Sequence, residues 1–402
     1  VLNPLAGYAV GLSVRPPLVS RPALFVAQGS DPPRLNGSKP VPHVFHTLEP
    51  GPVKQRLVPV LSSSLAFLIG IVGGGWGFTS NGGGSTAEFL RIAPGARAAA
   101  MGEAYGPVAS GAEAVYWNPA GLAGIERPEA SYSHIELLSF VHHDHIAYAH
   151  PVPLLGGTLG SAFTVYYQDA LDLVTNTNQV VGTFKPHSEA FSLAFARSFG
   201  VGEDYREGDR AYFQDNWGIA GDYRPLDRGG DLWTGNLDAG LSLKVLQETL
   251  YDRKATAFAG DAGVRFRHQE AEDFALSFVL RNFGTRPRFI RERESLPVEA
   301  DIGASYDFQG DKRRLLAVLE AALPYYGAPF GKLGLEYSFR VGENSSMSLR
   351  TGYKTLSAPY LGFASGITAG VGLLTGKVTA DFSFQPLGTL GEAYRFSLGL
   401  RF

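Results

Sequence analysis

The sequence predicts an all-β fold, a transmembrane antiparallel β-barrel. Apolar residues alternate with small or charged residues in about fourteen or fifteen segments after residue 126. This pattern is typical of β-strands that have one apolar face. Many of these segments approach the roughly 9–11 residues that cross a bilayer at a tilt. The last segment, Tyr394–Phe402, alternates without a break and ends on an aromatic residue. A soluble β-sandwich also alternates, but this number of segments is large for one sandwich.

Composition supports strands over helices. The 402 residues include 50 Gly, 25 Pro, 26 Phe and 18 Tyr but only two Met, and Gly and Pro interrupt helices while aromatic residues favour strands. Mean hydropathy is −0.02 and no long apolar run recurs, which excludes a bundle of membrane-spanning helices. A net charge of −3 gives no field that favours nucleic acid as a partner. The absence of Cys excludes disulfides, thiolate metal sites and Cys nucleophiles.

The N-terminal part does not continue this pattern. Residues 1–50 are rich in Pro, Gly and Ser, and we interpret them as a disordered or mis-annotated extension. Residues 51–80 resemble a secretory signal peptide, because Lys54 and Arg56 precede the apolar stretch Leu57–Val72. Cleavage is expected between Gly75 and Ser85. A short membrane anchor or a buried helix is the alternative for this stretch.

Residues 126–402 are expected to form the barrel. The predicted strands are Ala130–Ile135, His143–Pro151, Thr158–Gln168, Ala190–Phe199, Trp217–Arg224, Leu237–Val245, Phe258–Arg267, Phe274–Asn282, Val298–Tyr306, Leu315–Leu323, Leu333–Arg340, Met347–Tyr353, Ile367–Leu373, Val378–Phe384 and Tyr394–Phe402. Backbone groups in lipid must all be paired, so such strands have to close into a barrel.

Residues 86–125 have a different character. Ala87–Ile92 and the Ala-rich Ala96–Tyr105 are predicted as two short helices, joined by a turn at Pro94 and Gly95. The run Asn118-Pro-Ala-Gly121 is typical of a plain turn.

Two motifs in this segment resemble a known family. They are Phe89-Leu-Arg-Ile-Ala-Pro-Gly-Ala-Arg-Ala-Ala-Ala-Met-Gly-Glu-Ala104 and Ala114-Val-Tyr-Trp-Asn-Pro-Ala-Gly-Leu-Ala123, and together they closely resemble the start of PorV/PorQ-type proteins, which belong to the FadL-like outer-membrane barrels. Asn282–Gly284 and Arg350–Tyr353 also look like landmarks of that family. Gly111 and Glu113 depart from its pattern, which often has Asp and a small residue there.

The resemblance implies a fourteen-stranded barrel whose segment 86–125 folds inside as a hatch. The residues that carry this hatch motif are Arg97, Met101, Gly102, Trp117, Asn118, Pro119, Ala120 and Gly121. In PorV-like proteins the barrel serves type IX protein secretion or shuttles cargo. The alternatives are FadL-like transport of hydrophobic small molecules and a structural barrel without transport. The expected partners are outer-membrane lipid, the barrel-assembly machinery, secreted cargo or secretion components, and hydrophobic small molecules; no cofactor is expected.

The closing strand has an implied second role. Outer-membrane barrels resemble one another in ending with an alternating strand and a terminal aromatic residue, which the assembly machinery reads. The residues that match are Tyr394, Phe396, Leu398, Leu400 and Phe402. We expect this strand to pair with the first strand near Ala130 and to close the wall.

Two polar clusters have ordinary interpretations. Five His, namely His134, His142, His143, His145 and His150, fall within seventeen residues, and a polar turn is a simpler explanation than a metal site. A strand would place His143 and His145 on one face and His142 on the other. The Arg-rich stretch from Arg286 to Arg293 reads as a solvated loop. No Gly-x-Ser-x-Gly or His-Glu-x-x-His motif occurs, so no enzymatic activity is predicted.

Overall fold

A computed structural model describes residues 85–402 of the chain, apart from 176, 178, 202–234, 269–272, 290, 291 and 311. The extension, the signal peptide and the predicted strand Trp217–Arg224 lie outside the described residues. Within the part of the chain that is described, no helix is long and apolar enough to cross a membrane.

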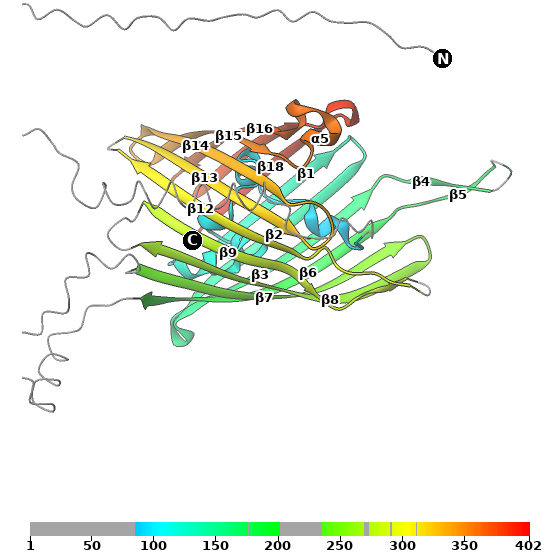
Figure 1. Ribbon diagram of the computed structural model, residues 1–402, viewed down its shortest axis with the longest axis horizontal. Helices are drawn as coiled ribbons and strands as arrows, with labels where there is room; N and C mark the ends of the chain where they lie inside the picture. The colour runs from blue at the N-terminus through cyan, green and yellow to red at the C-terminus, as the bar shows by residue number, and fades with distance from the viewer. Residues whose placement is uncertain are drawn as a thin grey trace, which may run out of the picture. The chain divides into compact units, whose positions relative to one another are not determined.

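Fourteen strands form one closed antiparallel barrel (Figure 1). They are β1 Glu129–Leu137, β2 Val141–Val152, β3 Gly157–Gln168, β6 His187–Val201, β7 Gly235–Leu250, β8 Arg253–His268, β9 Phe274–Gly284, β12 Glu299–Gln309, β13 Arg313–Pro324, β14 Phe330–Gly342, β15 Ser345–Lys354, β16 Ile367–Thr375, β17 Val378–Pro386 and β18 Glu392–Arg401. Each strand pairs with its neighbour in the chain, and β18 closes the wall against β1 with Ala130 opposite Leu400. The barrel and the predicted closure are thereby confirmed, and a soluble sandwich is excluded.

The two rims of the barrel differ. The terminal rim carries Phe402 and the connections 153–156 and 376–377, with η4 Pro153–Leu155 in the first. The loop rim carries the ribbon of β4 Leu171–Val174 and β5 Val180–Phe184, which projects beyond the wall (Figure 1). It also carries β10 Arg288–Phe289, β11 Glu292–Arg293, α5 Ala358–Leu361, η5 Phe363–Gly366 and η6 Gly388–Leu390. The β4–β5 ribbon was not predicted, because two strands of four and five residues give too short an alternation to detect.

Alternation along each strand separates two environments. On β18 the outward residues Phe396 and Leu398 are 56% and 55% exposed, whereas the inward residues Arg395 and Ser397 are buried. The same order recurs around the wall, so a belt of large apolar side chains faces outward while charged and small ones fill the lumen. Such a surface is stable only in lipid, and a closed antiparallel barrel of this kind is the form that spans the bacterial outer membrane.

Five short helical segments lie within the barrel in residues 85–125, the part of the chain expected to form a hatch and called the hatch below. They are η1 Glu88–Arg91, α2 Ala96–Ala100, η2 Gly106–Val108, α3 Ala114–Trp117 and η3 Pro119–Gly124. The predicted helix Ala96–Tyr105 is wrong in its second half, because α2 ends at Ala100. Gly102 and Glu103 there adopt left-handed φ angles of 64° and 62°, which end a helix. The predicted turn at Asn118 is the N-cap of η3, where its side-chain oxygen accepts a hydrogen bond from the Ala120 amide.

Candidate functional site

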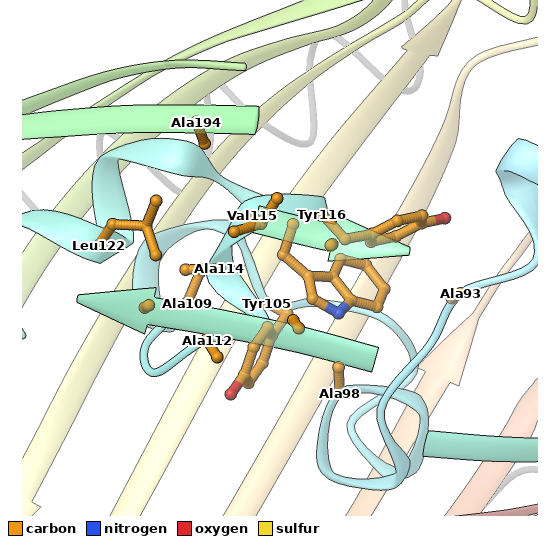
Figure 2. Packing of buried hydrophobic residues seen from close by; sticks show 14 of the residues in the cluster. Ala93, Ala98, Tyr105, Ala109, Ala112, Ala114, Val115, Tyr116, Leu122 and Ala194 are labelled. Atoms are coloured by element: carbon orange, nitrogen blue, oxygen red, sulfur yellow. The ribbon is translucent and has the colours of Figure 1, made fainter. Parts of the chain in front are cut away.

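The hatch runs through the lumen from the loop rim to the terminal rim. At the loop rim the Thr86 amide donates to the Ser295 carbonyl at 3.0 Å, and its hydroxyl donates to Glu248 at 2.7 Å. At the terminal rim the chain continues into β1, where the Phe402 amide donates to the Pro128 carbonyl at 3.0 Å. Figure 2 shows the core between them, in which Val115 and Leu122 of the hatch lie beside Ala194 of β6. Small side chains allow this packing in a narrow lumen.

Wall glycines receive the hatch backbone at two places. A Cβ atom added at Gly334 of β14 would lie 2.7 Å from the Met101 carbonyl oxygen, and one at Gly352 of β15 would overlap the Gly102 backbone. On the opposite wall, a Cβ atom at Gly240 of β7 would lie 2.5 Å from the Ala120 nitrogen. These contacts explain why the wall has glycine at Gly240, Gly334 and Gly352.

Arg97 is the main charged anchor of the hatch. Its Nε and Nη2 atoms donate to the two carboxylate oxygens of Glu336 on β14, at 2.7 and 3.0 Å. Its Nη1 atom donates to the Tyr105 hydroxyl at 3.2 Å. The Glu336 carboxylate also accepts from Nε of Arg350 at 2.6 Å, and Arg350 in turn donates to Asp381 at 2.6 Å. A bidentate guanidinium–carboxylate pair fixes orientation as well as charge.

Three further wall residues hold the hatch, and none of them was predicted. Lys354 forms an ion pair with Glu103, and Glu320 accepts a hydrogen bond from the Gly106 amide at 2.8 Å. Arg265 donates to the Ala109 carbonyl at 2.7 Å. In the sequence these inward charges look like any polar residue of an alternating strand, so only their position against the hatch distinguishes them.

Trp117 and Asn118 hold the hatch together internally. The Trp117 indole donates to the Pro94 carbonyl at 3.1 Å, and its ring meets the Tyr105 ring edge-to-face at 5.6 Å. The Asn118 amide nitrogen donates to the Gly106 carbonyl at 3.0 Å. Gly121 lies so close to the Ala109 carbonyl that a Cβ atom would overlap it. The predicted motif residues therefore come together in one folded unit.

Two cavities lie on either side of the hatch. The terminal-side cavity has a volume of about 510 Å³ and is lined by Arg97, Tyr105 and Glu113 of the hatch and by Glu336, Arg350 and Asp381 of the wall. The loop-side cavity has a volume of about 410 Å³, and its hatch side includes Tyr116 and Trp117. Tyr105 thus borders one cavity and Trp117 the other, so their ring contact forms part of the partition between the two.

The loop-side cavity combines aromatic and apolar side chains with a few charges. Besides the hatch residues, its lining includes Phe330, Tyr326, Pro324, Leu356 and Tyr360. The Arg281 guanidinium lies 5.7 Å from the Trp117 ring and is neutralised by Glu299 and Asp301, each at 2.6 Å. Such a pocket can receive the body of an organic molecule and still offer polar groups at its edge.

Glu113 places an unusual carboxyl group in the terminal-side cavity. Burial, together with the nearby Asp381, raises its pKa to about 7, although Arg97 and Arg350 act in the opposite direction. Within the described residues no hydrogen-bond donor to this carboxyl is found. The position is one of the two at which the sequence departs from the family pattern.

The clustered His residues lie on strands β1 and β2, so the predicted polar turn is wrong. His143 and His145 face the lumen and are buried, whereas His142 faces outward, which confirms the predicted division between faces. The five residues of the closing strand lie together on the outer surface, all of them exposed, as Tyr394, Phe396, Leu398, Leu400 and Phe402.

Comparison with known proteins gives fold-level similarity only. No protein-family profile matches the sequence, and no curated protein matches it. Among solved structures it is similar to the Pseudomonas putida toluene transporter TodX, with 10% identity and a TM-score of 0.43 over 76% of this chain and 96% of that chain. A Pseudomonas aeruginosa FadL homologue has 12% identity and a TM-score of 0.42 over 76% and 97% of the two chains. The Ralstonia pickettii toluene transporter TbuX has 12% identity and a TM-score of 0.39 over 77% and 98%.

All three TM-scores are below 0.5, so no residue role is taken from these proteins. The chain is a fourteen-stranded membrane barrel of the outer-membrane type whose lumen holds residues 85–125 between two cavities.

Proposed function

We propose that the protein is a gated outer-membrane channel for small molecules with an apolar or aromatic body, and that the hatch closes it. The single observation that carries the proposal is the pair of cavities of about 510 and 410 Å³ on opposite sides of the hatch. A purely structural barrel has no need of a cavity at each rim. The proposal favours FadL-like transport over a role in type IX secretion.

The nature of the loop-side cavity supports the class of solute. Aromatic rings and prolines supply flat apolar surface, while Arg91, Lys354 and Glu103 supply polar contacts. A solute bound there would reach the terminal-side cavity once Tyr105 and Trp117 separate. Ion pairs and hydrogen bonds connect the hatch to the wall, and such contacts can exchange partners as the hatch moves.

The test is uptake of radiolabelled toluene and radiolabelled laurate by cells that carry the full chain. The double variant Tyr105→Ala, Trp117→Ala removes both rings of the partition between the two cavities. Uptake of either probe is therefore expected to rise several-fold over that of the parent. Tyr337→Ala is the matched control, because this outward aromatic residue of β14 touches neither cavity. Equal uptake by the parent, both variants and cells without the protein would reject the channel.

A second function has one observation in its favour. Tyr360 on α5 is 83% exposed at the mouth of the loop-side cavity, and Tyr325 and Leu356 beside the same cavity are also exposed. An apolar rim can hold an extended polypeptide, as a PorV-like role in cargo secretion needs. Co-purification of the barrel with an exported protein that carries a type IX sorting domain tests it. Retention that is unchanged in a Tyr325→Ser, Tyr360→Ser variant would count against this role.

A further inference from the structure

One connection at the terminal rim ends in an apolar tip that the described part of the chain leaves uncovered. This β2–β3 turn, residues 153–156, contains η4, and its residues Leu154 and Leu155 are 94% and 49% exposed. Leu154 is the most exposed of the large apolar side chains that the structure describes. Adjacent exposed leucines mark a surface of contact more often than an ordinary turn.

Other short connections on the same rim are polar. The turns 310–312, 343–344 and 376–377 join β12 to β13, β14 to β15 and β16 to β17. They carry the exposed charged residues Lys312, Glu343 and Lys377, which keep their tips in water. The apolar tip is therefore a property of the β2–β3 turn and not of the rim as a whole.

The turn is continuous with the apolar belt of the wall. Leu159 of β3 and Phe199 of β6, both close to the turn, are outward and exposed. The Arg197 guanidinium lies beside the turn, since a Cβ atom added at Gly156 would be 3.4 Å from its Cζ, and it lies 5.5 Å from the Phe199 ring. A cationic side chain paired with an aromatic ring is typical of the level at which a membrane meets water.

The wall itself offers little apolar surface on this side. Between Asp144 and His150 the outward residues of β2 are Ile146 and Tyr148 alone. A strand needs roughly 9–11 residues to cross the bilayer, so the apolar part of β2 is short for the membrane. Apolar residues in the turn add membrane contact at the terminal rim, where β2 lacks it.

We propose that the β2–β3 turn inserts into the membrane leaflet at the terminal rim, with Leu154 and Leu155 among the lipid chains just below the headgroups. Short apolar segments beside a cationic residue bind at this boundary, because they remove apolar surface from water while the charge stays at the phosphates. The insertion fixes the depth of this side of the barrel in the membrane. The contact lies outside the lumen and does not depend on the proposed transport.

Quenching of a single fluorophore by lipid tests the insertion. The chain contains no Cys, so Leu154→Cys and the control Glu343→Cys can each carry one bimane label. The full chain is folded into phosphatidylcholine vesicles whose acyl chains are brominated either near the headgroup or near the chain end. The label at position 154 should be quenched several-fold more strongly than the label at position 343, and more by the shallow bromines than by the deep ones. Equal quenching at the two positions overturns the proposal.

A second substitution separates the turn from its label. Leu155→Asp places a charge beside the labelled residue, so quenching at position 154 should fall to the level at position 343 in protein that still shows heat-modifiable migration. Quenching that survives Leu155→Asp would mean that the label enters the membrane by itself, which also overturns the proposal. The vesicles contain no other protein, so a turn that serves only to dock a protein partner would behave like the control.

Discussion

Arg97 of the hatch and Glu336 of β14 form a bidentate ion pair inside the lumen, with nitrogen–oxygen distances of 2.7 and 3.0 Å. The pair connects the Ala-rich α2 to the wall, and Arg350 shares the same carboxylate. Arg97 therefore has a structural role, because its ion pair attaches the first half of the hatch to β14.

Replacing Glu336 with Gln is expected to loosen the hatch. The change leaves Arg97 without its carboxylate in a buried site, and breaking a buried pair in this way costs about 3–5 kcal/mol. Amide hydrogen exchange of residues 96–105 should therefore become at least a hundredfold faster, while exchange in the wall strands stays slow. Glu343→Gln, an exposed carboxyl of the β14–β15 turn, is the control. If exchange of this peptide is the same in both variants, Arg97–Glu336 is not an anchor.

Gly352→Ala is expected to displace the hatch by steric overlap, without any change of charge. Its Cβ atom would overlap the Gly102 backbone, whereas the nearest atom to a Cβ atom at Gly331 is Cγ2 of Thr355 at 3.9 Å. Overpacking of this kind costs typically about 1–3 kcal/mol. The thermal midpoint of hatch opening, followed by Trp117 fluorescence in a background where Trp76, Trp217 and Trp233 are replaced by Phe, should fall in Gly352→Ala and remain unchanged in Gly331→Ala. A fall of equal size in both variants would mean that the loss comes from the sheet and not from the hatch.

The wall could be predicted from the sequence, because each strand shows its own alternation. All fourteen barrel strands were identified, and most extend by one to four residues at an end. The ends of the strands were predicted less precisely, because near the rims the inward and outward residues differ less in polarity. β7, for example, continues past the predicted end at Val245 to Leu250, because the inward residue Leu246 is apolar and interrupts the alternation.

The arrangement of the hatch could be predicted only in part. The motif residues lie in one segment of the sequence, but the wall residues that contact this segment, Glu336, Lys354 and Arg265, lie far along the chain. Long-range pairing of this kind leaves no local pattern in the sequence. The early end of α2 at Ala100 is also a tertiary effect, because Gly102 packs against β15.

The hatch is expected to be less stable at neutral than at acidic pH, through Glu113. Its folded-state pKa of about 7 lies above the ordinary Glu value of 4.5, so the folded state binds the proton more tightly. The contribution is fully present below about pH 4.5 and is lost as pH rises through about 7. Hydrogen exchange of residues 111–117, corrected for the intrinsic pH dependence, should therefore show weaker protection at pH 8 than at pH 5.

The matched variant is Glu113→Gln, which has the same shape but cannot ionise. Its protection should be similar at both pH values and should resemble that of the parent protein at pH 5. The exposed Glu343→Gln serves as the control and should keep the pH dependence of the parent. If Glu113→Gln retains that dependence, another group is responsible.

Phe402→Ser is expected to lower the yield of assembled barrel more than its stability. The Phe402 amide still donates to the Pro128 carbonyl in the variant, and the register of β18 against β1 is set by the preceding residues. The lost ring is exposed at the terminal rim, so its removal should shift the thermal midpoint of assembled protein little. Pulse-labelling with heat-modifiable migration gives the yield, and Phe339→Ser removes another aromatic residue close to the same rim. Equal yields for the two variants would show that the terminal residue is not part of an assembly signal, whereas a selective loss in Phe402→Ser would support that role.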